Sequence, residues 1–366
     1  MSSISRRSLL SLAGTTAAGI AMAAVPRLSQ AVPVGKQIRA LYGDAIVIDA
    51  LSVAHGWDDE TFAAIDASGY TGIVTSLPRQ DLQTAINAMI EWRERVRAHP
   101  DRFLIALTAS DFERAKREGK LAVLMNFQNA TMLEGDADNV EALHALGMRC
   151  FQLTYNERNL LGDGSTERTD AGLSDFGVEV VGRMNQVGVL VDLSHCGRQT
   201  TLDGIAISDR PVAFTHTMCE ALRRNHPRAK TDDQIRALAD KGGVIGIAAL
   251  GYFIGRNPGR DTTIETYLDH VDHAVSIAGT DHVALSTDFQ IRGIKPWATR
   301  ENWYEPRLEA FKSSYDVQWP PWIPELDAPD RFLQVAARLS SRGYRDHDIE
   351  KLLGLNWLRL FRETIG

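Results

Sequence analysis

Short apolar runs alternate with longer amphipathic stretches along most of the chain. Eight apolar runs, each of about three to seven residues, are mostly rich in Val, Ile, Leu or Phe. They are residues 45–48, 72–75, 121–127, 149–153, 189–193, 212–214, 244–249 and 283–285. Continuous apolar runs of this length are typical of strands that are buried on both faces of a sheet.

The stretches between these runs carry apolar residues at helical spacing. Helices are expected at residues 82–98, 112–118, 139–146, 176–186, 232–239, 262–278 and 346–364. Gly147 and Gly188 follow two of these stretches and are good helix stops. The alternation predicts a single-domain (β/α)8 TIM-type barrel over residues 32–366. An open doubly wound sheet is the alternative, but no G-x-G-x-x-G follows the first strand to support a dinucleotide-binding fold.

Residues 293–330 interrupt this alternation with four tryptophans and several prolines. A stretch of this composition predicts a long ordered loop rather than a flexible linker. Its tryptophans are expected either to pack under the barrel rim or at a dimer contact, or to form a wall of the substrate pocket.

The N-terminal segment has the pattern of an export signal. Arg6 and Arg7 precede a weakly apolar stretch that ends near Ala24. Residues 1–31 are therefore expected to be a twin-arginine signal peptide and linker, cleaved after Ala23 or near Ala31, and the linker continues to residue 40. An N-terminal anchor helix is the alternative. The signal predicts the twin-arginine export machinery as a partner, and a periplasmic or otherwise exported location.

Composition excludes some classes of partner. The chain has 366 residues, of which 44% are hydrophobic, and a formal net charge of -7. No basic cluster stands out, so nucleic acid is not an expected partner. Cys150, Cys196 and Cys219 lack the regular spacing of a disulfide framework and are interpreted as buried free thiols, with one bridge as the alternative.

Polar residues follow several of the apolar runs at the point where each strand should end. His195 follows the fifth run, His216 the sixth and Asp288 the eighth. Active sites of parallel barrels lie at the carboxyl ends of the strands, so these side chains are expected to meet there. Imidazole and carboxylate are ligands that suit Zn²⁺, and Asp288 is expected to be the third ligand or the base that takes a proton from a metal-bound water.

Several segments then resemble the membrane (renal-type) dipeptidases, which are zinc peptidases of the amidohydrolase-like barrels. The similar segments are Val191–His195 (V-D-L-S-H), Phe214–His216, Arg223–Asn225, Gly242–Gly246, Ser286–Phe289 and Leu353–Arg359. Together with other matches they cover roughly residues 43–362 in the order of the family.

This resemblance implies a zinc centre that hydrolyses dipeptides. By position, His195 and His216 would be ligands of one zinc, and Asp288 would be a ligand of a second zinc or the base. Arg224 would hold the substrate carboxylate, since a guanidinium matches the geometry of that group.

The chain departs from the family at the first, third and fourth strands. The family motif D-G-H-N-D is replaced by residues 49–53, Asp-Ala-Leu-Ser-Val, which removes a His and an Asp ligand. Gln128 stands where the family has a bridging Glu, and Tyr155 where it has a His. We therefore expect one zinc ion rather than two. His55 and Asp58 are candidates to refill the site.

Three functions remain open from the sequence. The first is a mononuclear zinc hydrolase of a small peptide or amide, in which Gln128 or Tyr155 polarises the carbonyl and Arg224 binds a carboxylate. The second is a non-hydrolytic periplasmic maturation enzyme for a secreted peptide metabolite, with proton transfer by Tyr155, Asp288 or the histidines. The third is a binding protein without catalysis. A homodimer is an expectation by analogy with the barrel type alone.

Overall fold

The computed structural model describes residues 33–52, 57–257 and 260–366. The predicted twin-arginine signal, its cleavage sites and His55 lie outside these residues. Within them, no helix has both the length and the apolar character needed to cross a membrane.

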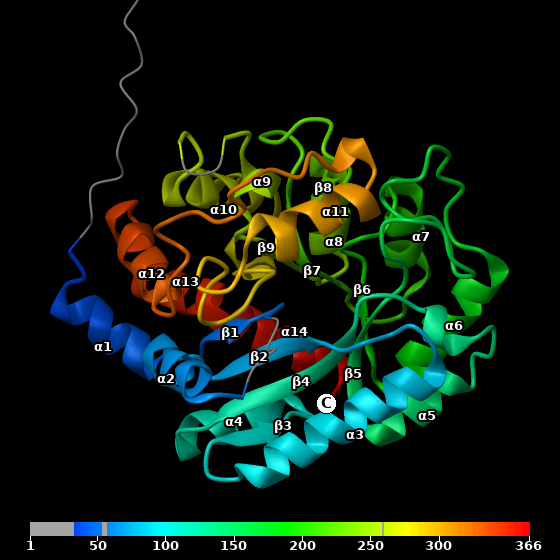
Figure 1. Ribbon diagram of the computed structural model, residues 1–366, viewed down its shortest axis with the longest axis horizontal. Helices are drawn as coiled ribbons and strands as arrows, with labels where there is room; N and C mark the ends of the chain where they lie inside the picture. Colours follow the sequence, from blue (N-terminus) through cyan, green and yellow to red (C-terminus); the bar gives the residue numbers. More distant parts are fainter. Residues whose placement is uncertain (1–32, 53–56, 258–259) are drawn as a thin grey trace, which may run out of the picture.

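The eight predicted strands form one parallel sheet that curls into a barrel (Figure 1). In sheet order they are β1 (Ile48–Asp49), β2 (Gly72–Ser76), β4 (Leu121–Phe127), β5 (Met148–Gln152), β6 (Leu190–Asp192), β7 (Ala213–Cys219), β9 (Val244–Ile247) and β10 (Val283–Leu285). The last strand meets the first, because Ser52 forms a parallel bridge with Phe289 and the Asp288 N–H donates to the Leu51 carbonyl over 2.9 Å. The prediction of a (β/α)8 barrel is confirmed, and the open sheet is excluded.

Two further strands are too short to show a pattern in the sequence. The strand β3 (Phe103–Ile105) pairs with the start of β4, and β8 (Ala229–Lys230) pairs with the end of β7. Both depend on a neighbouring strand for their hydrogen bonds.

All seven predicted helices are present, with bounds shifted by a few residues. The helices in chain order are α1 (Lys36–Asp44), α2 (Asp59–Ser68), α3 (Leu82–Ala98), α4 (Ala109–Glu118), α5 (Asn139–Leu146), α6 (Asp175–Val187), α7 (Arg198–Ile207), α8 (Asp232–Asp240), α9 (Gly251–Ile254), α10 (Ile264–Ala278), α11 (Glu305–Ala310), α12 (Arg331–Ser341), α13 (Asp346–Glu350) and α14 (Asn356–Thr364). A π-helical turn, Lys351–Leu355, connects α13 to α14. Gly147 and Gly188 end α5 and α6 with φ values of 113° and 84°, as the stop signals predicted.

The prediction of a linker up to residue 40 was wrong at its end. Helix α1 begins at Lys36 and buries Ile38 and Tyr42 in the core. The apolar spacing in this short helix is sparse, so its contact with α12 decides its structure.

The end of the barrel next to α14 is a packed core. One buried cluster joins side chains from the strands to the last helix, and includes Ile48, Val74, Leu124, Leu190 and Trp357. Trp357 is fully buried on α14, and the cluster also includes Phe361, one turn further along this helix. Helix α14 therefore packs against one end of the barrel, and the chemistry is left to the carboxyl end of the strands.

Cys150, Cys196 and Cys219 are all buried and free, which confirms their interpretation as thiols.

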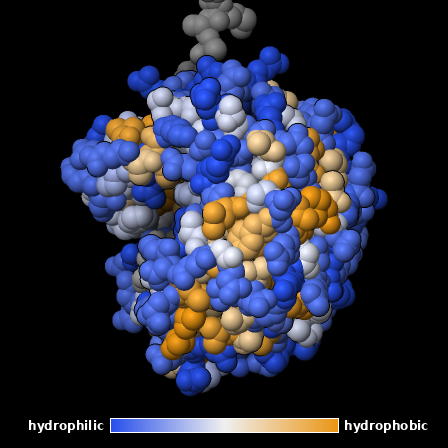
Figure 2. Space-filling view, turned by 90° about the vertical axis from the view of Figure 1, so that its right-hand side faces the viewer, coloured by the Kyte–Doolittle hydropathy of each residue, from blue (hydrophilic) through white to orange (hydrophobic). Residues whose placement is uncertain are grey.

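The face that carries α6 and α7 shows apolar side chains among polar ones (Figure 2). Val178 on α6 is an exposed apolar residue, as is Leu202 on α7. The homodimer and the export partner remain predictions.

Candidate active site

A pocket of about 360 Å³ lies at the carboxyl ends of the strands. Four of the predicted site residues line it: Gln128 after β4, Tyr155 after β5, His195 after β6 and Asp288 after β10. A second hollow, of about 600 Å³, is lined by residues such as Tyr42 and Lys116 and holds none of the strand-end residues. The smaller pocket is therefore the candidate active site.

Residues 293–330 form a wall of this pocket, as one of the two interpretations expected. Trp297, Trp303, Arg307, Phe311 and Tyr315 all line it. The other two tryptophans of the segment, Trp319 and Trp322, belong to the same aromatic cluster. The ring centroid of Trp319 lies 6.4 Å from that of Trp303 and 5.1 Å from that of Trp322.

Three buried side chains between β7 and β8 hold this wall in place. Arg223 forms a 2.6 Å ion pair with Asp316. Arg228 donates from Nη1 to the Tyr315 hydroxyl over 3.1 Å, and its Nη2 donates to the carbonyl of residue 216 over 2.8 Å. The Nε2 of His226 lies 3.0 Å from the Tyr315 carbonyl. Because Nδ1 of His226 accepts from a backbone N–H, Nε2 carries the proton, and burial lowers the pKa of this histidine to about 3.

The two predicted histidine ligands meet inside the barrel. His195 and His216 are buried, and their Nε2 atoms lie 2.9 Å apart. Burial, with the nearby Arg228 as a second cause, lowers the pKa of both rings well below the ordinary value, so both are neutral near pH 7.

The partners of the two Nδ1 atoms decide which ring nitrogen carries the proton. Nδ1 of His195 lies 2.8 Å from Oδ1 of Asn156, an acceptor, so Nδ1 is the donor. Nδ1 of His216 lies 2.8 Å from Oγ1 of Thr215, and that hydroxyl already donates to Asp192 over 2.7 Å. Nδ1 of His216 is then also a donor. The two Nε2 lone pairs consequently face each other, an arrangement that a shared proton or a metal cation would stabilise.

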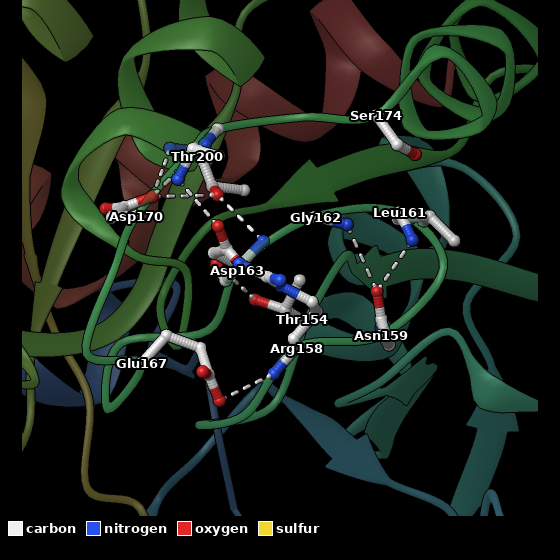
Figure 3. A network of polar contacts seen from close by, with 12 residues as sticks. Thr154, Arg158, Asn159, Leu161, Gly162, Asp163, Glu167, Asp170, Ser174 and Thr200 are labelled. Carbon is white, nitrogen blue, oxygen red and sulfur yellow. Dashed lines mark hydrogen bonds and ion pairs between the residues drawn. The ribbon is translucent and has the colours of Figure 1, made fainter.

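Asn156 belongs to the segment between β5 and α6. A network of polar contacts orders this segment (Figure 3). Its carbonyl accepts from the N–H of Thr166 over 2.8 Å, and its own φ is 57°. Further along, Oδ1 of Asn159 accepts from the N–H of Leu161 over 2.8 Å, and the backbone of residue 163 donates to Thr200 on α7 over 3.1 Å. These contacts give the segment one shape, and a sequence pattern could not have shown that Asn156 is aimed at a histidine.

Tyr155 and Gln128 lie beside this pair. The Tyr155 ring stacks on His195 with 4.1 Å between ring centroids, and the guanidinium of Arg79 covers the Tyr155 ring at 4.4 Å. Burial raises the pKa of Tyr155, so its hydroxyl keeps its proton near neutral pH. Gln128 is buried, and its backbone carbonyl accepts a hydrogen bond from Nε2 of Gln152 over 2.6 Å.

Asp288 follows β10 and has a left-handed backbone conformation. Its φ is 69°, which is uncommon for a residue other than glycine. The neighbouring Thr287 is fixed to β1, because its hydroxyl donates to the buried carboxylate of Asp49 over 2.6 Å. Removal from water raises the pKa of Asp288 to about 7, although the positive charges of Arg228 and Arg307 oppose the shift.

Arg224 lies apart from the other predicted site residues. It is exposed and does not line the pocket. The guanidiniums that do line it belong to Arg79, on the loop after β2, and Arg307, on α11. No motif in the sequence marked either of them.

The described residues only partly fit a metal. The two Nε2 atoms converge as a pair of imidazole ligands would, and their Nδ1 contacts are those that commonly orient metal-binding histidines. However, no group of three His, Cys, Asp or Glu side chains that could hold a metal ion occurs within residues 33–52, 57–257 and 260–366. Asp58 is used elsewhere, as it caps α2 by accepting from the N–H of Thr61 over 2.8 Å.

Comparison with known proteins gives the family. Residues 41–299 match the membrane dipeptidase family, peptidase family M19. Dipeptidase verJ from Clonostachys rogersoniana is 30% identical over 269 residues, which are 72% of this chain and 61% of that protein. The chain thus spans less than two thirds of the length of this relative.

Solved structures agree with this result. The crystal structure of an amidohydrolase from Pseudomonas aeruginosa is similar with a TM-score of 0.80 and 29% identity, over 90% of this chain and 99% of that one. The dipeptidase AC, a metallopeptidase of family M19, shares the fold with a TM-score of 0.70 at 19% identity, over 88% of this chain and 99% of that one. Since the family match spans most of the chain and includes both His195 and His216, the chain belongs to the membrane dipeptidase family, a family of metallopeptidases.

Proposed function

We propose that this chain hydrolyses a peptide or amide bond in a small substrate, at a single zinc ion bound by His195 and His216. The observation that carries the proposal is the 2.9 Å approach of two neutral Nε2 atoms whose Nδ1 atoms are both engaged as donors. Two lone pairs held this close by a rigid barrel favour a cation between them. Membership in a family of metallopeptidases supports the same interpretation.

The side chains around the pair supply the remaining roles. A bound zinc would lower the pKa of its water to about 7. Asp288 is proposed as the base rather than a third ligand, since its pKa of about 7 suits proton transfer near neutral pH. Tyr155 keeps its proton and is proposed to donate a hydrogen bond to the substrate carbonyl, with Gln128 as a second candidate donor.

The departures at the first strand support one ion rather than two. Leu51 is fully buried at the end of β1 and has no atom that binds a metal. Val53 occupies the other altered position. The proposed enzyme works outside the cytoplasm, because Arg6 and Arg7 head a twin-arginine signal.

A second candidate is a non-hydrolytic maturation enzyme or a binding protein on the same scaffold. The lack of a third His, Cys, Asp or Glu ligand within the described ranges favours it. It would use the same pocket for proton transfer or for binding alone.

Metal analysis combined with a dipeptide hydrolysis assay tests the proposal. We expect about one zinc per chain in protein purified without chelators, and loss of both zinc and activity in His195→Ala and His216→Ala. The matched control is His273→Ala, since His273 lies on α10, contacts Asp232 and does not line the pocket. Wild-type protein that binds no zinc, or that hydrolyses dipeptides equally well after His195→Ala, would overturn it.

A further inference from the structure

Two guanidiniums line the candidate active site without an acidic partner. Arg79 and Arg307 are both half-buried, and neither lies within 4.0 Å of a carboxylate in the part of the chain that the structure describes. Among the other half-buried arginines, Arg292 contacts two acidic side chains and Arg342 contacts three. Arg149 and Arg210 donate to backbone carbonyls instead. A guanidinium withdrawn from water without an anion is costly, so an unpaired pair in a pocket points to an anionic ligand.

Aromatic rings hold both guanidiniums in place. Arg79 lies over the ring of Tyr155 at 4.4 Å, and Arg307 lies over the ring of Trp303 at 4.0 Å. Arg307 also donates from Nη1 to the Trp303 carbonyl over 2.8 Å. A guanidinium has five N–H donors, so those not used in these contacts remain for the planar fork that matches a carboxylate.

The two arginines stand on different walls of one pocket. Arg79 comes from the loop between β2 and α3, whereas Arg307 comes from α11 within the 293–330 wall. Both act electrostatically on Tyr155, whose ring covers His195. Both arginines therefore line the pocket that also contains Tyr155 and His195, and a ligand there with two anionic groups would meet both.

The rest of the lining adds one acid and a large aromatic surface. Asp288 is the one acidic side chain in the pocket lining of the described residues. The aromatic residues of the lining are Tyr155, Tyr252, Phe253, Phe289, Trp297, Trp303, Phe311 and Tyr315. A volume of about 360 Å³ suits a small molecule, and the chain as a whole is acidic, so the positive lining is a local feature.

We propose that the substrate is an acidic dipeptide, with one carboxylate for Arg79 and a second for Arg307. This inference rests on the proposed hydrolytic function and adds the substrate class to it. It also gives the carboxylate a partner inside the pocket, where Arg224 does not lie.

Matched substrates test the charge directly. Ala-Glu and Ala-Gln have nearly the same shape but differ by one carboxylate. A charge-assisted hydrogen bond predicts that kcat/KM for Ala-Glu exceeds that for Ala-Gln by about tenfold or more in the wild-type protein. Arg307→Gln and Arg79→Gln should bring this ratio toward one, and Arg307→Lys should keep part of it because the charge remains without the fork.

The control is Arg300→Gln. Arg300 belongs to the same wall and stacks on Tyr304 at 4.8 Å, but it is exposed and does not line the pocket. It should leave the ratio unchanged. Circular dichroism and thermal unfolding of each variant check that it is folded, and a ratio that stays constant in folded Arg307→Gln and Arg79→Gln overturns the inference.

A binding measurement separates this inference from the proposed function. Calorimetric titration of His195→Ala with Ala-Glu and with Ala-Gln reports recognition without hydrolysis. Tighter binding of Ala-Glu that is lost on adding Arg307→Gln supports the inference, even if the wild-type protein hydrolyses neither peptide and the proposed function fails. Hydrolysis of both peptides at equal rates overturns the inference alone, and absence of any binding of Ala-Glu also overturns it.

Discussion

The side chain of Asn156 should control how well His195 binds a metal. Its Oδ1 lies 2.8 Å from Nδ1 of His195, and this contact keeps the proton on Nδ1 and the lone pair on Nε2. Asn156→Gly removes this hydrogen bond without straining the backbone, because the φ of 57° at this position is one that glycine adopts freely. Asn156→Asp keeps an oxygen acceptor at the same place.

The expected effect follows from the loss of one orienting hydrogen bond. Removal of such a partner typically weakens metal affinity about 10- to 100-fold, which corresponds to about 1.4–2.7 kcal/mol. Without the acceptor, the His195 ring is free to carry its proton on Nε2, the nitrogen that faces His216 at 2.9 Å. Asn156→Asp should bind zinc at least as tightly as the wild-type protein, since a carboxylate is a stronger acceptor than an amide.

Competition with a chromophoric chelator would give the zinc dissociation constants. Asn225→Gly is the matched control, because Asn225 also has a positive φ, of 62°, but is exposed and lies outside the pocket. An Asn156→Gly protein that binds zinc as tightly as Asn225→Gly would refute the role of the asparagine and the tautomers inferred from it.

Two further predictions concern stability. His270 accepts on Nδ1 from the N–H of Cys219 and lies 3.0 Å from the Ile254 carbonyl through Nε2, and burial lowers its pKa from 6.5 to about 4. Below pH 6.5 the unfolded chain therefore binds more protons than the folded one, so this residue should lower the unfolding free energy by about 1.4 kcal/mol for each unit that the pH falls between about 6.5 and 4. Urea denaturation at several pH values should show a smaller loss of stability on acidification for His270→Gln than for the wild-type protein. Equal losses in the two proteins would contradict the claim. Trp357→Ala should lower the unfolding free energy by about 3–5 kcal/mol, because the side chain is fully buried and its Nε1 donates to the Leu285 carbonyl over 3.2 Å; a loss below about 1 kcal/mol would show that α14 does not support the barrel.

The pattern of apolar residues was sufficient to predict the barrel. Its strands are buried on both faces, so each gives a continuous apolar run, and eight such runs correspond to the eight strands of the closed sheet. The same pattern located seven helices. It missed the other helices and two short strands: α1, α2, α7, α9, α11, α12, β3 and β8. Of these, α1 and β3 are stabilised by contacts with α12 and β4 rather than by their own periodicity.

The strand ends likewise placed much of the candidate site. The carboxyl ends of parallel strands meet at one rim, so the sequence alone predicts that residues as far apart along the chain as His195 and Asp288 share one pocket. The 2.9 Å approach of His195 to His216 agrees with that expectation.

The tertiary structure alone decided the rest. Asn156 and Arg79 belong to loops, and Arg307 to the short helix α11 within the 293–330 wall. Their roles come from the packing of these segments onto the barrel. The sequence likewise could not tell whether Arg224 or Arg228 faces the interior, since both lie in one irregular segment between β7 and β8, and only the fold buries Arg228 against Tyr315. Periodicity reports burial along an element, whereas the direction of a loop side chain depends on neighbours that the chain reaches only when it folds.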